Sequence, residues 1–177
     1  MTMTRSHNLE LVEAARARFR PDQIMTLFIG ESAPDSDKFF YFGKNPMLTY
    51  TRKAIEQALG ADGSDIRDRF KALGWYLDDL SLAPVNKLAP AMRKSACHAA
   101  RRTLAERIAV YKPQAIVTVA ASVKDDVAAV AIAAGCDAPR YVTPFPGQHY
   151  QNDYMRYLVE IIPQLPRVTA HIHNLTR

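Results

Sequence analysis

Two side chains suited to catalysis lie in segments that follow apolar, strand-like runs. Glu31 comes directly after the run 24–29 and Gly30, and a carboxylate at the end of a buried strand can activate a water molecule or stabilise a cation. A solvated loop carboxylate, or a cap for nearby backbone N–H groups, fits the same position equally well. His149 lies in the proline-bearing segment 144–151, where its imidazole could stabilise developing negative charge or simply face solvent.

Aromatic and acidic residues near the first two apolar runs could recognise a planar ligand. Residues 39–42, which include Tyr41, are four consecutive aromatic residues. Alternation along an extended segment sends at least two of the rings into the core, which leaves one ring to stack on a base. Asp78 and Asp79 adjoin near the end of the second run, so they point to opposite faces and cannot form a paired acid/base dyad. We expect one of them to face a ligand at the sheet edge and the other to lie at the surface or cap the next loop.

The charge and the metal-binding residues restrict the partners. The 177 residues carry 23 Lys and Arg against 18 Asp and Glu, a formal charge of +5, which favours a polyanionic partner without requiring one. A basic face at helical spacing suits either phosphate contacts or, more commonly, plain solvation; it comprises Lys94, His98, Arg101 and Arg102. His171 and His173 have no cysteine or carboxylate nearby, and two cysteines are too few for a disulfide framework, so we expect no metal site and no cofactor.

The elements that must position these residues alternate between buried strands and helices. Apolar runs predict strands near 24–29, 75–80, 115–119 and 140–143, and helical spacing predicts helices over 6–20, 52–59, 64–73, 91–111, 122–135 and 153–162. A capping box is expected at 122–125 and a serine cap at Ser64. This order predicts a single α/β domain over 1–177, with an ordered core of about 6–163 and a parallel sheet covered on both faces.

The predicted fold indicates where a ligand would bind. In such folds ligands bind at the carboxyl ends of the strands, and the loops after residues 29, 80 and 143 are the irregular, proline-bearing stretches of the chain. We therefore expect Glu31, Tyr41, Asp78 and His149 to line one pocket there. No apolar run reaches the length of a membrane span and no leader-like segment opens the chain, so the expected protein is cytoplasmic, without a membrane partner.

Four segments between residues 22 and 163 match, in order and spacing, the motifs of a known family. Residues 27–34 read Leu-Phe-Ile-Gly-Glu-Ser-Ala-Pro, and an aromatic loop ends at Gly43. Residues 75–86 lead into a loop that carries Pro84 and Asn86, and a Lys-Pro pair at 112–113 precedes the run 115–119. Together these segments resemble the uracil-DNA glycosylase superfamily, whose first motif reads Gly-Glu-Ala-Pro-Gly in some bacterial members.

The resemblance implies a three-layer α/β sandwich with a central four-stranded parallel sheet, and it implies roles for particular residues. Glu31 would position or activate the attacking water, Tyr41 would stack on the extruded base, and Asp78 would contact the edge of that base. His149 would be the candidate for stabilising the leaving base. The contacts to the nucleic-acid backbone would come from Asn86, Pro146 and Gly147.

The chain also departs from the family pattern. The family usually has His-Pro-Ser after the last strand, where this sequence has Phe145-Pro146-Gly147, and losing that histidine could cost a few powers of ten in rate. Asp78 falls where an asparagine normally reads uracil; a carboxylate offers acceptors only and would repel the O4 atom of uracil. The cysteines of the iron–sulfur members are absent, so no iron–sulfur cluster is expected.

The sequence therefore predicts a divergent glycosylase-like hydrolase that cleaves the N-glycosidic bond of a flipped base in DNA or another nucleic acid, and that processes uracil poorly. The alternative is a catalytically silent nucleic-acid or nucleotide-binding protein on the same fold. A protein-interaction module is a third possibility that the charge allows.

Overall fold

The protein is a four-stranded parallel sheet with helices around it. The structure, a computed structural model, describes residues 5–169 and, of their side chains, those from residue 8 onward, so His171 and His173 lie outside the described residues. The strands are β1 (Thr26–Ser32), β2 (Trp75–Ser81), β3 (Ala115–Thr118) and β4 (Arg140–Val142), in the spatial order β2-β1-β3-β4. All neighbouring pairs run parallel, which confirms the predicted α/β class with a four-stranded parallel sheet.

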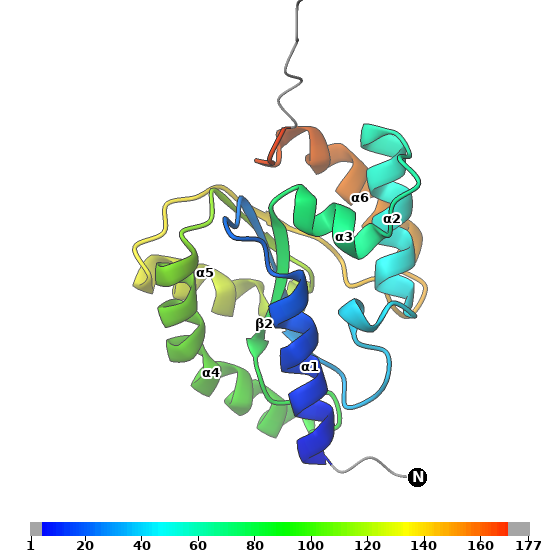
Figure 1. The fold of residues 1–177 in the computed structure, drawn as a ribbon. Helices are drawn as coiled ribbons and strands as arrows, with labels where there is room; N and C mark the ends of the chain where they lie inside the picture. Colours follow the sequence, from blue (N-terminus) through cyan, green and yellow to red (C-terminus); the bar gives the residue numbers. More distant parts are fainter. Residues whose placement is uncertain (1–4, 170–177) are drawn as a thin grey trace, which may run out of the picture.

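The helices cover both faces of the sheet. Figure 1 shows α4 and α5 on one side of the sheet and α2, α3 and α6 on the other, with α1 beside the edge strand β2. The bounds of the α-helices are α1 (Arg5–Phe19), α2 (Pro46–Leu59), α3 (Ile66–Ala72), α4 (Pro90–Tyr111), α5 (Lys124–Ala133) and α6 (Gln151–Ile161). Short 3-10 helices are η1 (Phe40–Phe42), η2 (Ala121–Val123) and η3 (Ile162–Gln164).

The core is built from the strands that lie deepest in the sheet. The first four residues of β1 and the whole of β2 and β3 are buried, as expected for parallel strands covered on both faces. On the side of α3, the rings of Phe28, Phe70 and Trp75 lie within 5.7 Å of one another between centroids. This cluster and the aliphatic residues of β3 hold the sheet in place beneath the strand ends.

The starts of three helices differ from those expected. Helix α2 begins at Pro46 instead of residue 52, because the Asn45 side chain accepts a hydrogen bond from the Leu48 N–H (2.8 Å) and proline suits the first helical turn. Asp65, not Ser64, caps α3, through a bond from the Arg67 N–H. The expected capping box at 122–125 is wrong, because residues 121–123 form η2 and no side chain caps α5.

Candidate functional site

The carboxyl end of β1 is where the topology favours a ligand. Strand β1 lies between β2 and β3, so the chain leaves β1 and β3 toward opposite sides of the sheet. This arrangement is a topological switch point, at which open α/β sheets bind their ligands. Glu31 is the penultimate residue of β1, which ends at Ser32. We call Glu31, Arg93 and Cys97, with the loops that follow the strands, the strand-end site.

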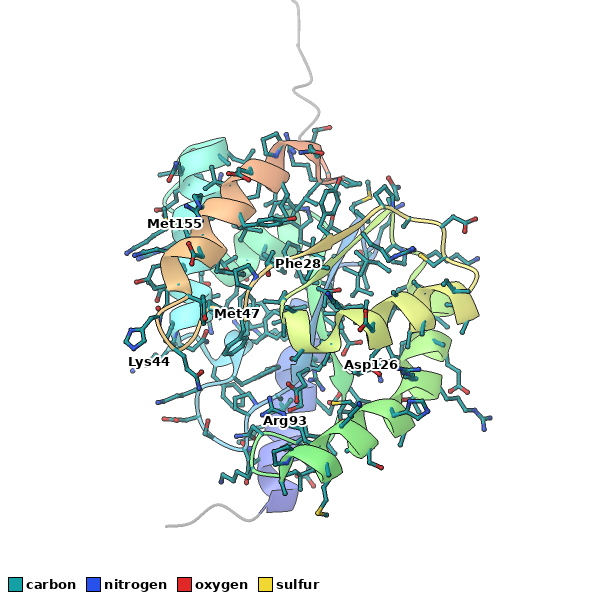
Figure 2. All side chains as sticks on the ribbon, turned by 180° about the vertical axis from the view of Figure 1, so that it is seen from behind. Phe28, Lys44, Met47, Arg93, Asp126 and Met155 are labelled. Atoms are coloured by element: carbon teal, nitrogen blue, oxygen red, sulfur yellow. The ribbon has the colours of Figure 1, made fainter. Side chains whose placement is uncertain are left out.

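Glu31 is held by the first turn of α4. The Arg93 guanidinium donates through Nε to Oε1 of Glu31 and through Nη2 to Oε2, the latter over 2.5 Å. The side chain of Glu31 is 12% exposed and that of Arg93 is 43% exposed, so the ion pair opens to solvent on the arginine side. The bond to Glu31 raises the pKa of Arg93. In Figure 2, Arg93 of α4 and Asp126 of α5 lie below Phe28, toward the carboxyl ends of the strands.

Cys97 lies beside the same carboxylate. Its Sγ atom is 3.9 Å from Oε1 of Glu31 and its side chain is buried. Burial, and then the negative charge of Glu31, raise the pKa of the Cys97 thiol to about 11. The thiolate is the nucleophilic form of cysteine, so at neutral pH Cys97 contributes packing and not nucleophilic chemistry.

The loops after β1 and β2 are bonded to each other. The Asn86 side chain accepts a hydrogen bond from the Asp35 N–H (3.3 Å), and the Ser32 hydroxyl accepts one from the Val85 N–H (3.2 Å). Lys87 pairs with the Asp35 carboxylate over 3.1 Å. Asn86, expected at a nucleic-acid backbone, is exposed and ties the two loops together.

Tyr41 is part of the hydrophobic core. Its side chain is 1% exposed. The rings of Phe19 and Tyr76 stack on it at centroid distances of 5.5 and 6.2 Å, and Phe39 and Phe40 meet it edge-on. A base could stack on this ring only if these neighbours moved. Of the four consecutive aromatic rings, three are buried and only Phe42 is half-exposed, so Phe42 is the ring that a ligand can reach.

Asp78 and Asp79 are both buried, so the expectation that one of them lies at the surface is wrong. Asp78 Oδ2 accepts hydrogen bonds from Arg107 Nε (3.0 Å) and the Tyr111 hydroxyl (3.1 Å). Its Oδ1 accepts one from the Asp79 N–H at 2.8 Å. Asp78 pairs in register with Ile29, two positions before Glu31, and each residue of a strand advances it by about 3.3 Å. Both of its oxygens are therefore occupied below the end of the strand.

These contacts close the outer edge of β2. The Tyr41 hydroxyl accepts from the Leu77 N–H (2.7 Å) and donates to the Leu77 carbonyl (3.2 Å). Asp78 accepts from the Asp79 N–H, and Arg107 Nη2 donates to the Asp79 carbonyl over 2.5 Å. Unpaired backbone groups of an edge strand need partners when they are buried. We call this row of bonds, made by Tyr41, Asp78 and Arg107, the sealed edge.

Asp79 extends the buried charges to α1. Arg16 Nη2 donates to its Oδ2 over 2.5 Å, and the two side chains are 3% and 6% exposed. Burial raises the pKa of Asp79 to about 6, although Arg16 opposes this shift. On the neighbouring strand, a Cβ atom added to Gly30 would lie 2.4 Å from Oδ1 of Asp79. A side chain at position 30 would therefore displace the carboxylate of Asp79.

The segment after β4 presents its side chains outward. Gln148 and His149 both have positive φ angles, 49° and 77°, a conformation unusual for residues other than glycine. His149 is exposed, Pro146 is buried, and the Gly147 N–H donates to the Phe145 carbonyl (2.8 Å). Phe145 is 59% exposed and Tyr150 is 56% exposed. No hydrogen bond or ion pair among the described residues joins His149 to Glu31.

A groove of about 500 Å³ opens elsewhere, between α1 and α4 over the edge strand β2. We call it the α1–α4 groove. Asp78 lines it, whereas Glu31, Tyr41 and His149 do not. This groove therefore does not bring the four expected residues together, because Asp78 alone among them lines it.

The sequence reasoning missed Arg93 and Arg107. Both lie on the face of α4 that also carries Cys97, Leu104 and Ile108, and that faces the sheet. Arg93 precedes Cys97 by four residues, so on a helix the two side chains lie on the same face. Extending the apolar stripe of this helix by one turn toward its N-terminus would therefore have indicated Arg93.

No protein-family model matches this chain, and no curated protein matches it. Within residues 5–169, no group of three or more histidine, cysteine or carboxylate side chains is placed to hold a metal ion. In the same part of the chain, none of the helices is both long and apolar enough to cross a membrane.

Proposed function

We propose that the protein is a glycosylase-like hydrolase that acts on an extruded base of a nucleic acid at the strand-end site. The observation that carries the proposal is the position of Glu31, a half-buried carboxylate at the carboxyl end of β1, beside the switch point of the sheet. The motif resemblance adds support, because it assigns the water-positioning role to the same residue. The charge of +5 suits a polyanionic substrate.

In the proposed reaction Glu31 holds the attacking water and stabilises positive charge on the sugar as the base departs. The oxygen of water bonds to the anomeric carbon, the carbon–nitrogen bond breaks, and the proton of water ends on the released base. Arg93 keeps the carboxylate in place and directs its exposed guanidinium toward a phosphate. Phe42 replaces Tyr41 as the proposed platform for the base, because its ring is the accessible one.

The second candidate function is nucleic-acid binding without turnover. One observation favours it: Arg93 occupies both oxygens of Glu31. A carboxylate in that state orients a water less readily than a carboxylate with one free oxygen. Activity then depends on whether substrate phosphate draws Arg93 away.

The test is cleavage of labelled oligonucleotides, single- and double-stranded, that carry uracil, hypoxanthine, xanthine or a mismatch. We expect alkali-labile abasic sites with at least one base other than uracil. Glu31→Gln should lower the rate by about 100-fold or more, since it removes the charge that acts in the transition state. The matched control Glu160→Gln changes an exposed carboxylate of α6 and should leave the rate unchanged.

The outcomes separate the two candidates. Binding of the oligonucleotides without any cleavage supports the silent binder and excludes the hydrolase. Cleavage that survives in Glu31→Gln removes Glu31 from the proposed chemistry. If the protein neither binds nor cleaves the oligonucleotides, both functions are excluded.

A further inference from the structure

We propose that the protein binds a single-stranded nucleic acid along the outer face of α2. The inference rests on the proposed function, because it names the substrate as a single strand that leaves the strand-end site in the direction of α2. We call this surface the α2 face. Its members are exposed cations and half-exposed rings, namely Lys38, Phe42, Lys44, Tyr50, Arg52 and Lys53.

The α2 face carries positive charge that no carboxylate neutralises. Its four cations are exposed, and none of the ion pairs formed within residues 8–169 involves them. The chain has no aspartate or glutamate between Asp37 and Glu56. On α6, which packs against α2, Asp153 pairs with Arg156 over 2.8 Å, and Glu160 is the other acid of that helix. A polyanion therefore meets free positive charges on this surface.

The basic face of α4 differs from the α2 face in this respect. Its three arginines are each bonded to a carboxylate, in the pairs Arg93–Glu31, Arg101–Asp126 and Arg102–Glu106. The fold thus neutralises most of the charge of α4 and leaves the charge of the α2 face free. We therefore expect a phosphate backbone that passes the strand-end site to follow α2 and not α4.

The rings of the α2 face distinguish a single strand from a duplex. Phe42 and Tyr50 are half-exposed, and the Lys53 Nζ atom lies 4.9 Å from the centroid of the Tyr50 ring. An aromatic side chain can stack on a base only where that base is unpaired and turned outward. A ring with a cation beside it offers one contact to such a base and one to the phosphate of the same strand.

The α2 face continues from the strand-end site. In Figure 2, Lys44 and Met47, which flank the start of α2, lie below Phe28, as Arg93 does. Lys53 follows the first residue of α2 by seven residues, which places it about 10 Å farther along the helix axis. A strand of a few nucleotides can therefore reach both the strand-end site and the cations of α2.

The test is fluorescence anisotropy of the whole chain with a labelled oligothymidylate of about 12 nucleotides, within the usual site size of single-strand binders. The same oligonucleotide in a duplex is the second probe, and we expect it to bind more weakly by about 10-fold or more. The double variant Arg52→Gln, Lys53→Gln should weaken binding of the single strand by about 10-fold. It should also lower the slope of log K against log salt by roughly 1.4, because each phosphate contact to a single strand contributes about 0.7.

A second variant tests the ring. Tyr50→Ala should weaken binding by about 5- to 100-fold, as expected for the loss of one stacked base, and should leave the salt slope unchanged. Tyr50→Phe keeps the ring and should bind as the wild type does. The matched control Lys94→Gln, Arg102→Gln removes two exposed charges from α4 and should change the affinity by less than about 2-fold.

The outcomes separate this inference from the proposed hydrolase. The inference is wrong if the duplex binds as tightly as the single strand, or if the α4 variant weakens binding as much as the α2 variant does. Cleavage that depends on Glu31, with unchanged binding in the α2 variant, refutes the inference and leaves the hydrolase standing. Binding that depends on the α2 face, without cleavage of any substrate, refutes the hydrolase and supports the inference.

Discussion

Glu31 and Asp78 are two carboxylates that face α4 from neighbouring strands, yet they occupy opposite environments. Glu31 has one ion-pair partner, Arg93, whose side chain is 43% exposed, and the Cys97 thiol lies 3.9 Å from its Oε1. Asp78 is 2% exposed and is bonded to Arg107, Tyr111 and a backbone N–H. Both acids follow apolar strand residues in the sequence, so the chain itself does not distinguish them. The difference lies in the number of partners and in the access to solvent, and it is the reason why we propose chemistry at Glu31 and a structural role for Asp78.

The largest expected effect comes from removing Asp78. Asp78→Ala should lower the free energy of unfolding by about 3–5 kcal/mol, because it leaves the buried Arg107 charge without its partner. Glu31→Gln should cost about 1 kcal/mol or less, since the side chain of its partner Arg93 is 43% exposed and solvent screens the pair. Urea unfolding followed by the fluorescence of Trp75, the single tryptophan of the chain, measures both. Equal losses in the two variants would erase the distinction between the two sites.

The pH dependence of stability gives the next test, at Asp79. Its pKa is raised by burial from 3.8 to about 6 in the folded protein. The folded state therefore takes up a proton more readily than the unfolded state, and this contribution to stability is present below about pH 4 and is lost as the pH rises through 6. Relative to Asp79→Asn, the wild-type protein should gain at most about 1.4 kcal/mol per pH unit as the pH falls from 7 to 4. A flat difference between the two proteins would mean that Arg16 cancels the effect of burial on the pKa of Asp79.

A third test concerns Gly30, which joins the two regions. Gly30→Ala should cost about 1–3 kcal/mol, as overpacking typically does, because the new Cβ atom meets the carboxylate of Asp79. Ser32→Ala in the same strand removes one hydrogen bond to a backbone N–H and should cost about 1 kcal/mol or less. Thermal unfolding compares the two variants. A Gly30→Ala protein as stable as the wild type would show that the Asp79 side chain moves freely.

The smallest expected effect is that of the Tyr41 hydroxyl. Tyr41→Phe keeps the ring in the core but leaves the N–H and carbonyl of Leu77 without their partner, which should cost about 1–2 kcal/mol. Tyr157→Phe, at a more exposed ring of α6, should change the stability by less than about 0.5 kcal/mol. Hydrogen exchange at Leu77 gives a second measurement, because its amide should exchange faster only in Tyr41→Phe.

Much of the fold could be predicted because its signals are local. The apolar runs 24–29 and 115–119 are each interrupted by a single threonine, Thr26 and Thr118, and they overlap the observed strands β1 and β3. The start of α2 was not predicted although Asn45-Pro46 is a helix-initiating pair, because the polar Thr51 interrupts the spacing between Leu48 and Ala54 on the buried face. The end of β1 at Ser32 could not be read from its own residues, since its register with β2 sets it.

The site was less predictable because its partners are distant in sequence. Arg16 lies 63 residues from Asp79, and Arg107 lies 29 residues from Asp78. No sequence pattern near either aspartate indicates that these arginines are its partners. The sequence therefore allowed a surface position for one of the two acids. The position of Glu31 at the end of β1 followed from the strand alone, whereas its pairing with Arg93 depends on how α4 crosses the sheet.

The sealed edge also governs how the molecule behaves toward copies of itself. An open edge strand is a template on which a second chain can add a strand, and such additions lead to aggregation. Side chains of the protein already occupy the outward groups of Leu77 and Asp79, so β2 has no free hydrogen-bonding positions there. A substitution that opens this row should therefore let β2 pair with a strand of another chain and promote aggregation at high concentration.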